Sequence, residues 1–145
     1  MLNSHMITYQ WVPDLPDLRD YKYLKTGLVI PTQKDLRDKM SPVEDQSTIG
    51  SCTGNAIVGL MEFLENLKGG VFTDLSRLFV YYNERLMEGT TRRDAGAVIR
   101  DGIKTVSNFG VCSEVLWPYD ITKFKLFIQF FGCFHIMLLI HFLRH

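Results

Sequence analysis

Apolar residues recur at helical spacing in the middle of the chain. The first such stretch begins at Cys52, and Gly69-Gly70 follows it as a stop signal. The apolar residues expected on its inward face are Ile57, Leu60, Met61, Leu64 and Leu67. The pattern therefore predicts an amphipathic helix from Cys52 to Leu67.

Two further helices are predicted, with short loops between all three. Ser76 is a good N-cap for the second helix, and Gly89 ends it. Its helical repeat is carried by Phe79, Tyr82 and Leu86. The third helix should follow Asp94 and stop at Gly110. The residues expected on its inward side are Val98, Ile99, Ile103 and Val106.

The N-terminal segment has the pattern of a loop instead. The stretch "WVPDLPDLRDY" (11–21) contains two prolines and repeated aspartates, so it should run extended over the surface of the protein. We therefore divide the chain into an extended leader, 1–34, a helical body, 35–122, and a tail, 123–145. Ordinary surface packing is the simpler role for the leader, and a short latency segment that covers a cleft is the alternative.

The tail differs from the rest of the chain. Residues 126–145 contain one charged side chain, and six of the ten phenylalanines lie from Phe124 onward. A membrane helix over 124–143 and a buried structural replacement are two interpretations. We favour a third, in which the tail is not native sequence and results from translation in a shifted frame.

Composition and charge exclude several classes of function. The 145 residues make about one domain, 46% of them apolar and 22% charged, which is typical of a folded protein. Sixteen basic residues balance sixteen acidic ones, so no nucleic-acid partner is indicated. Three scattered cysteines suit neither a metal site nor a disulfide framework. The absence of a signal-peptide pattern favours an intracellular setting.

The stretch "DQSTIGSC" (45–52) has the residue types of a nucleophilic cysteine site. A thiolate at the first turn of a helix is favoured by the helix dipole and by unpaired backbone N–H groups. The side-chain amide of Gln46 could turn toward the same point, beside the N–H of Cys52, as an oxyanion hole. Gly50 and Ser51 would let a substrate approach closely. A small buried cysteine at a helix start is the commoner alternative.

Several ordered motifs extend this signal. "PVEDQSTIGSCTGNA" resembles the active-site segment of papain-like cysteine peptidases, in which Gln46 would be the oxyanion glutamine and Cys52 the nucleophile. "DLRDKMSPVEDQ" resembles the start of the mature enzyme, and "LSRLFVYYNER" resembles its second helix. "DAGAVIRDGIKTVSNFGVCSEVLWPYD" resembles the stretch that carries the substrate-cleft glycine, here Gly96, and a Trp-Pro-Tyr motif. The resemblance covers residues 35–120.

The resemblance implies an α+β papain-like fold, of which this chain supplies mainly the α-helical half. It implies hydrolysis of peptide bonds in peptide or protein substrates through a cysteine acyl-enzyme, without metal or cofactor. Three features depart from the family. Ile49 replaces the cysteine of a structural disulfide, Thr53 replaces a tryptophan, and the leader is too short for a long helical propeptide. The lost disulfide fits a reducing compartment.

The histidine and asparagine of the family's β-rich half have no clear counterpart. "FHIMLLI" faintly resembles the family's histidine strand, which makes His135 a general-base candidate. However, His135 lies only 83 residues after Cys52, where the family needs well over a hundred. We therefore expect a truncated and inactive chain that self-associates through an exposed apolar face. The alternative function is a non-catalytic helical module that binds a peptide or partner.

Overall fold

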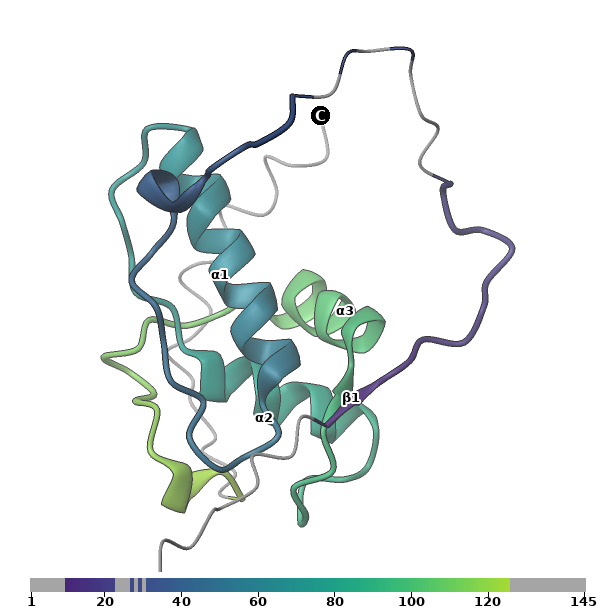
Figure 1. The fold of residues 1–145 in the computed structure, drawn as a ribbon. Coiled ribbons are helices and arrows are strands. Elements are labelled where there is room, and N and C mark those ends of the chain that lie inside the picture. Colours follow the sequence, from purple (N-terminus) through teal and green to yellow (C-terminus); the bar gives the residue numbers. More distant parts are fainter. Residues whose placement is uncertain (1–9, 23–26, 28, 30, 126–145) are drawn as a thin grey trace, which may run out of the picture.

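The computed structural model describes residues 10–22, 27, 29 and 31–125. Its main elements, in chain order, are β1 (Trp11–Val12), α1 (Cys52–Leu67), α2 (Arg77–Met87), β2 (Ala97–Val98) and α3 (Ile99–Phe109). Single 3-10 turns, η1 (Arg37–Lys39) and η2 (Ile121–Lys123), flank them. The three predicted helices are confirmed, and the two short strands pair in parallel. The three helices pack against one another, and the N-terminal segment reaches them beside the start of α3 (Figure 1).

The helix ends follow the signals in the sequence. The Ser76 side chain accepts a hydrogen bond from the backbone N–H of Phe79 at 3.1 Å, so it caps α2 as predicted. Gly110 ends α3 with φ 72°, a conformation that costs glycine nothing because it has no Cβ. These local contacts explain why pattern alone located both helices.

The hydrophobic core lies where α2 faces the other helices and the loop that follows α3. Leu78 and Tyr81 of α2 are fully buried, and Trp117 from the loop contacts Phe79 edge-on at a ring distance of 5.6 Å. Ile49 is buried in the same cluster. An apolar side chain therefore fills the position at which the papain-like pattern has a disulfide cysteine.

Charged residues are also buried among the helices. Glu62 of α1 pairs with Arg77 of α2 at 2.9 Å, and both side chains are almost wholly buried. Arg85 is fully buried, lies 4.2 Å above the Tyr81 ring and donates to backbone carbonyls that include Thr91 O at 3.1 Å. These contacts supply partners that a buried charge requires.

The predicted inward faces were partly wrong. Ile57 and Val106 are buried, whereas other predicted inward residues are 40–58% exposed, namely Leu60, Leu64, Leu67, Leu86 and Ile103. The buried side chains of α1 include Thr53, Ile57 and Val58 in its first half, whereas Leu60, Leu64 and Leu67 lie nearer its C-terminal end and are more exposed. The helical pattern predicted that the helix forms, but it did not predict which of its apolar side chains are buried.

The described part of the leader is extended, apart from one turn near Asp17, as the prolines predicted. Most of the apolar tail, 126–145, lies outside the described residues, and so does nearly all of the predicted membrane span, 124–143. Within the described residues, no helix is long and apolar enough to cross a membrane.

Candidate active site

Cys52 is the first residue of α1, and its side chain is partly exposed. The preceding residue, Ser51, is the N-cap, but its side chain makes no capping hydrogen bond. The first-turn N–H groups of α1 are therefore not occupied by a cap hydroxyl, and the positive end of the helix dipole lies at the thiol. The thiol is therefore partly accessible at the N-terminus of α1.

Gln46 lies in the tight turn that leads into α1. Asp45 accepts a hydrogen bond from the backbone N–H of Ser47 at 2.8 Å, and Ser47 has φ 54°, so the turn has a defined and strained shape. The amide nitrogen Nε2 of Gln46 donates to the carbonyl oxygen of Ile49 at 3.1 Å. Since an amide nitrogen has two hydrogens, one donor remains for a substrate oxygen.

A hydrogen-bonded chain connects this turn to the start of α1. Asn55 Nδ2 donates to Ser51 Oγ at 3.1 Å, Ser51 Oγ bonds to the Tyr119 hydroxyl, and Tyr119 donates to the carbonyl oxygen of Gln46 at 3.0 Å. Burial raises the pKa of Tyr119, which keeps this hydroxyl protonated and able to donate. Tyr119 thus holds together the residues on both sides of the candidate oxyanion hole.

The loop that carries Tyr119 is itself fixed to α2. The backbone N–H of Ser76 donates to Cys112 O at 2.8 Å, and Ser76 Oγ donates to Trp117 O at 2.6 Å. The helix cap Ser76 therefore also positions the Trp-Pro-Tyr motif.

Asp94 joins the two sides of the candidate cleft. Both of its carboxylate oxygens accept from the backbone N–H of Gly50 at 3.0 Å, and Oδ1 also accepts from the Tyr81 hydroxyl. Tyr81 in turn accepts from the N–H of Gly96 at 3.2 Å. Burial and the Asp94 carboxylate raise the pKa of Tyr81, so it stays a donor to Asp94. One buried network thus sets the position of Gly50 relative to Gly96.

Gly96 lies directly against the backbone of the leader. It has φ 69°, and a Cβ at this position would overlap the carbonyl oxygen of Gln10. The Gln10 side chain extends to Gly50, where a Cβ would lie 2.6 Å from Gln10 Oε1. The adjacent residues Trp11 and Val12 pair in parallel with Ala97 and Val98. An extended peptide, the chain's own, therefore occupies the Gly96 edge.

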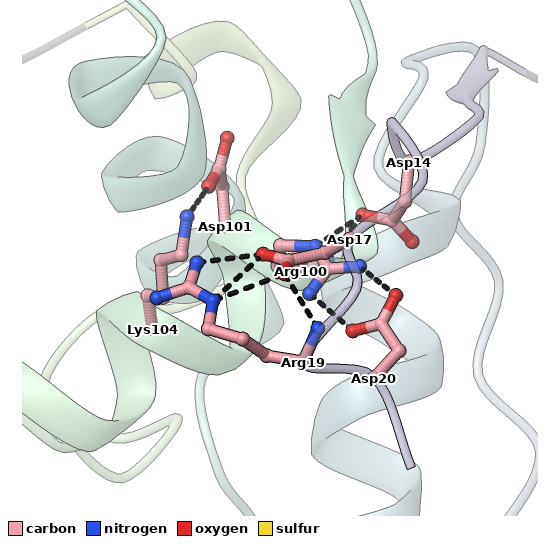
Figure 2. Close-up of polar contacts among 7 residues, drawn as sticks. All are labelled: Asp14, Asp17, Arg19, Asp20, Arg100, Asp101 and Lys104. Atoms are coloured by element: carbon pink, nitrogen blue, oxygen red, sulfur yellow. Dashed lines mark hydrogen bonds and ion pairs between the residues drawn. The ribbon is translucent and has the colours of Figure 1, made fainter. Parts of the chain in front are cut away.

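Acidic residues of the leader meet the first turn of α3 (Figure 2). Asp14 Oδ1 accepts from the backbone N–H of Arg100 at 3.0 Å, and Asp20 pairs with the Arg100 guanidinium through two hydrogen bonds of 2.8 Å. Asp17 bonds to Arg19 of its own turn. The hydrogen bond from Arg100 lowers the pKa of Asp20, so that carboxyl is ionised at neutral pH.

The structure brings together five of the six predicted site residues. One hydrogen-bonded network links Ser51 to Gln46, and a second links Gly50 to Gly96. Cys52 follows Ser51 directly, and Gly50 and Ser51 are buried, with Gln10 against Gly50. The catalytic and substrate-binding roles of these residues stay predictions. His135 lies outside the described residues. Among the described residues, no cluster of side chains could hold a metal ion.

Sequence reasoning missed the residues that support this site. Tyr119 stands in the Trp-Pro-Tyr motif, to which the resemblance gave no role at the site, and Asp94 was used only to mark where the third helix should begin. The partners of both are distant in sequence, because Asp94 reaches Gly50 across 44 residues and Tyr119 reaches Gln46 across 73. Of these two, only Tyr119 had a signal, the quoted motif.

A cavity of about 450 Å³ lies along α1, beyond Cys52. Residues 40–44 form one wall, and Asn55, Ala56 and Gly59 form the other. Cys52 does not line it, but Asn55, which also bonds to Ser51, does.

Known proteins share both the sequence and the fold of this region, although no protein-family model matches the chain. The chain is 49% identical over 83 residues to an uncharacterized peptidase C1-like protein of Acanthamoeba polyphaga mimivirus, a match that covers 57% of this chain and 27% of that protein. It is 41% identical to the crystal structure of xylellain, a cysteine protease from Xylella fastidiosa, with a TM-score of 0.69.

The xylellain match covers 77% of this chain and 43% of that one. A mite-allergen structure, at 20% identity and a TM-score of 0.52, covers 83% of this chain and 38% of its own, and shows a likeness of fold alone. The chain thus spans about a quarter of the curated relative and under half of either solved structure. The three helices and the two-stranded sheet match the helical half of the papain fold.

Proposed function

The chain belongs to the papain-like (C1) cysteine peptidase family, of whose fold it carries the helical half, and we propose from this that it supplies the nucleophile side of a peptide-cleaving site. Cys52 is the proposed nucleophile. The backbone N–H of Cys52 and the side-chain amide of Gln46 are the proposed oxyanion donors. The substrates are peptides or proteins that bind in extended form along Gly96.

The proposed reaction follows from these roles. The Cys52 thiolate attacks the scissile carbonyl carbon, a C–S bond forms, and the carbonyl oxygen becomes an oxyanion bonded by the two donors. Collapse of this intermediate breaks the C–N bond, and the leaving amine takes a proton from an imidazolium. Water then hydrolyses the thioester, which releases the acid and restores Cys52. In this proposal, Cys52 provides the nucleophile and one donor, and Gln46 provides the other donor.

The observation that carries this proposal is the joint placement of Cys52 and Gln46. A partly exposed thiol lies at the uncapped start of α1, and Tyr119 bonds to both the turn of Gln46 and the residue before Cys52. A small structural cysteine requires no such preorganisation of the turn beside it. Cys112 is an internal comparison, because it is 1% exposed and lies in the hydrophobic core.

The general base must come from outside the described residues, since all four histidines lie there. We therefore propose that catalysis needs a β-rich half that brings a histidine to Cys52. The 145-residue chain by itself should not turn over peptide substrates.

Alkylation of the folded 145-residue chain tests the role of Cys52. We expect iodoacetamide to modify Cys52 at least about tenfold faster than Cys112, because only Cys52 combines exposure with a helix N-terminus. Peptide mapping after timed quenching gives both rates, and a Cys52→Ala chain identifies the background. Inert Cys52 in the folded chain would contradict the proposal and favour a non-catalytic binding module.

Turnover is tested separately with fluorogenic peptides. We expect no cleavage above the rate of the Cys52→Ala chain. Cleavage that is lost in Cys52→Ala would show that the chain provides its own base, and His135→Ala would then identify it.

A further inference from the structure

The leader occupies the edge along which the proposed substrate would bind, so the inference below rests on the proposed function. Gln10 lies against Gly96 and Gly50, and β1 pairs with the residues that follow Gly96. The strand pairing is only two residues long on each side. Such a short pairing is weak by itself, so further contacts must keep the leader in place.

Those contacts converge on one residue, Arg100. Among the described residues, every side-chain hydrogen bond or ion pair from residues 11–22 to the body of the protein ends on Arg100. Asp14 bonds to its backbone N–H, and Asp20 makes a bidentate pair with its guanidinium. Both acids lie on the leader, and Arg100 lies in the first turn of α3, directly after β2 (Figure 2).

Asp17 and Arg19 of the leader pair with each other, so neither competes with Asp14 and Asp20 for Arg100. Asp17 accepts from Arg19 through both the backbone N–H, at 2.9 Å, and the guanidinium, at 2.6 Å. Asp20 N–H donates to Asp17 O at 3.1 Å, which completes a turn and aims Asp20 at α3. Arg19 therefore neutralises the middle aspartate, and the outer two face Arg100.

We propose that Arg100 is an ionic latch that holds the leader across Gly96, so that loss of its pairs with Asp14 and Asp20 opens the cleft to an extended substrate. The Arg100 and Asp20 side chains are 33% and 46% exposed, so water and salt reach the pair. The latch is accordingly reversible and sensitive to ionic strength. A substrate could bind along Gly96 only after the leader has left this position.

Amide hydrogen exchange at β1 measures the opening directly. In Arg100→Gln we expect exchange at Val12 to be roughly fivefold faster than in wild type, a size typical of a strong but exposed ion pair. In high salt, the exchange rate of the wild type should approach that of Arg100→Gln. Lys104→Gln is the matched control, because it removes an exposed cation of the same helix whose 2.7 Å pair is with Asp101.

A double-mutant cycle with Asp20→Asn separates the latch from a general charge effect. If the pair acts as one unit, Arg100→Gln/Asp20→Asn should open no further than Arg100→Gln alone. Equal exchange in wild type and Arg100→Gln, or an equal increase in Lys104→Gln, would overturn the proposal. So would full additivity of the two substitutions.

The proposed function and the latch are tested by two different measurements. Iodoacetamide labelling of Cys52 reports the nucleophile, whereas hydrogen exchange at β1 reports the leader. An inert Cys52 with a salt-sensitive leader would reject the function and keep the latch. A reactive Cys52, together with exchange rates that are the same in wild type and Arg100→Gln, would keep the proposed function and reject the latch.

Discussion

Tyr119 shows how one hydroxyl can position the residues of a candidate site without touching the candidate nucleophile. It bonds to Ser51, the residue before the candidate nucleophile, and to the backbone of Gln46, the candidate oxyanion donor. Two loops that are far apart in sequence thereby have one relative position. Preorganised donors of this kind need no rearrangement when charge develops on a substrate oxygen.

Tyr119→Phe should uncouple these loops. The Gln46 carbonyl and the Ser51 hydroxyl lose a partner, and we expect a loss of about 1 kcal/mol in unfolding free energy. At a temperature where both proteins are folded, alkylation of Cys52 should slow severalfold because the turn and the start of α1 become mobile. Urea unfolding and timed alkylation measure the two effects.

Tyr21→Phe is the control for Tyr119→Phe, since Tyr21 is fully exposed and the structure gives its hydroxyl no partner among the described residues. A Tyr119→Phe chain that is less stable but labels at the wild-type rate would limit Tyr119 to a structural role.

At the scale of elements, the packing of the three helices creates a buried carboxyl. Glu84 of α2 accepts from Thr53 of α1 at 2.8 Å, while its other oxygen has no partner among the described residues. Gly102 of α3 leaves the space that this oxygen occupies, because a Cβ there would overlap it. Burial raises the pKa of Glu84 to about 8, so the carboxyl is protonated in the folded protein at neutral pH.

The raised pKa of Glu84 predicts a fall in stability with rising pH. In the unfolded chain Glu84 ionises near its ordinary pKa of 4.5, whereas the folded chain keeps the proton to about pH 8. The folded state therefore binds more protons in this window, and the unfolding free energy should fall by roughly 2–4 kcal/mol across it, then level off. Urea unfolding at a series of pH values measures this slope.

Glu84→Gln should remove the slope and be more stable than wild type at pH 8, because the amide resembles the protonated acid. Asp38→Asn, an exposed carboxyl of η1, is the control and should leave the slope unchanged. A parallel pH dependence in wild type and Glu84→Gln would show that Glu84 is not its source.

At the scale of the whole molecule, the side of α1 that begins at Cys52 continues as an exposed apolar stripe. Leu60, Leu64 and Leu67 are 56%, 40% and 54% exposed, and Ala56 lies between them and Cys52 on the same side. A partner half docked on this stripe would lie next to the nucleophile, where the proposed histidine is needed. In isolation the stripe favours self-association.

Leu60→Glu/Leu67→Glu should therefore reduce self-association of the chain. We expect concentration-dependent oligomers for wild type in sedimentation velocity, and at least about a tenfold weaker association for the double variant, since two charges would be buried in any interface. Val115→Glu is the control, because Val115 is 87% exposed in a loop. A wild type that stays monomeric at all concentrations would mean that another part of the chain covers the stripe.

The sequence by itself determined the features that depend on near neighbours. Helix ends at Ser76 and Gly110 follow from contacts within four residues, and the extended leader follows from its prolines. The motif around Gln46 and Cys52 was readable for the same reason, since both residues lie in one short segment. The family and its helical half could thus be predicted before any coordinates were known.

Only the tertiary structure decided what depends on distant partners. Local periodicity placed Leu60 and Leu67 on an inward face, but a side chain is buried only where another element covers it, and both side chains are more than half exposed in the described part of the chain. From the sequence alone, the aspartates of the leader had no role beyond surface exposure, whereas the structure pairs two of them with Arg100. Hydrogen bonds and ion pairs between residues more than forty positions apart depend on how the chain packs. The pattern of apolar and polar residues along the sequence does not predict them.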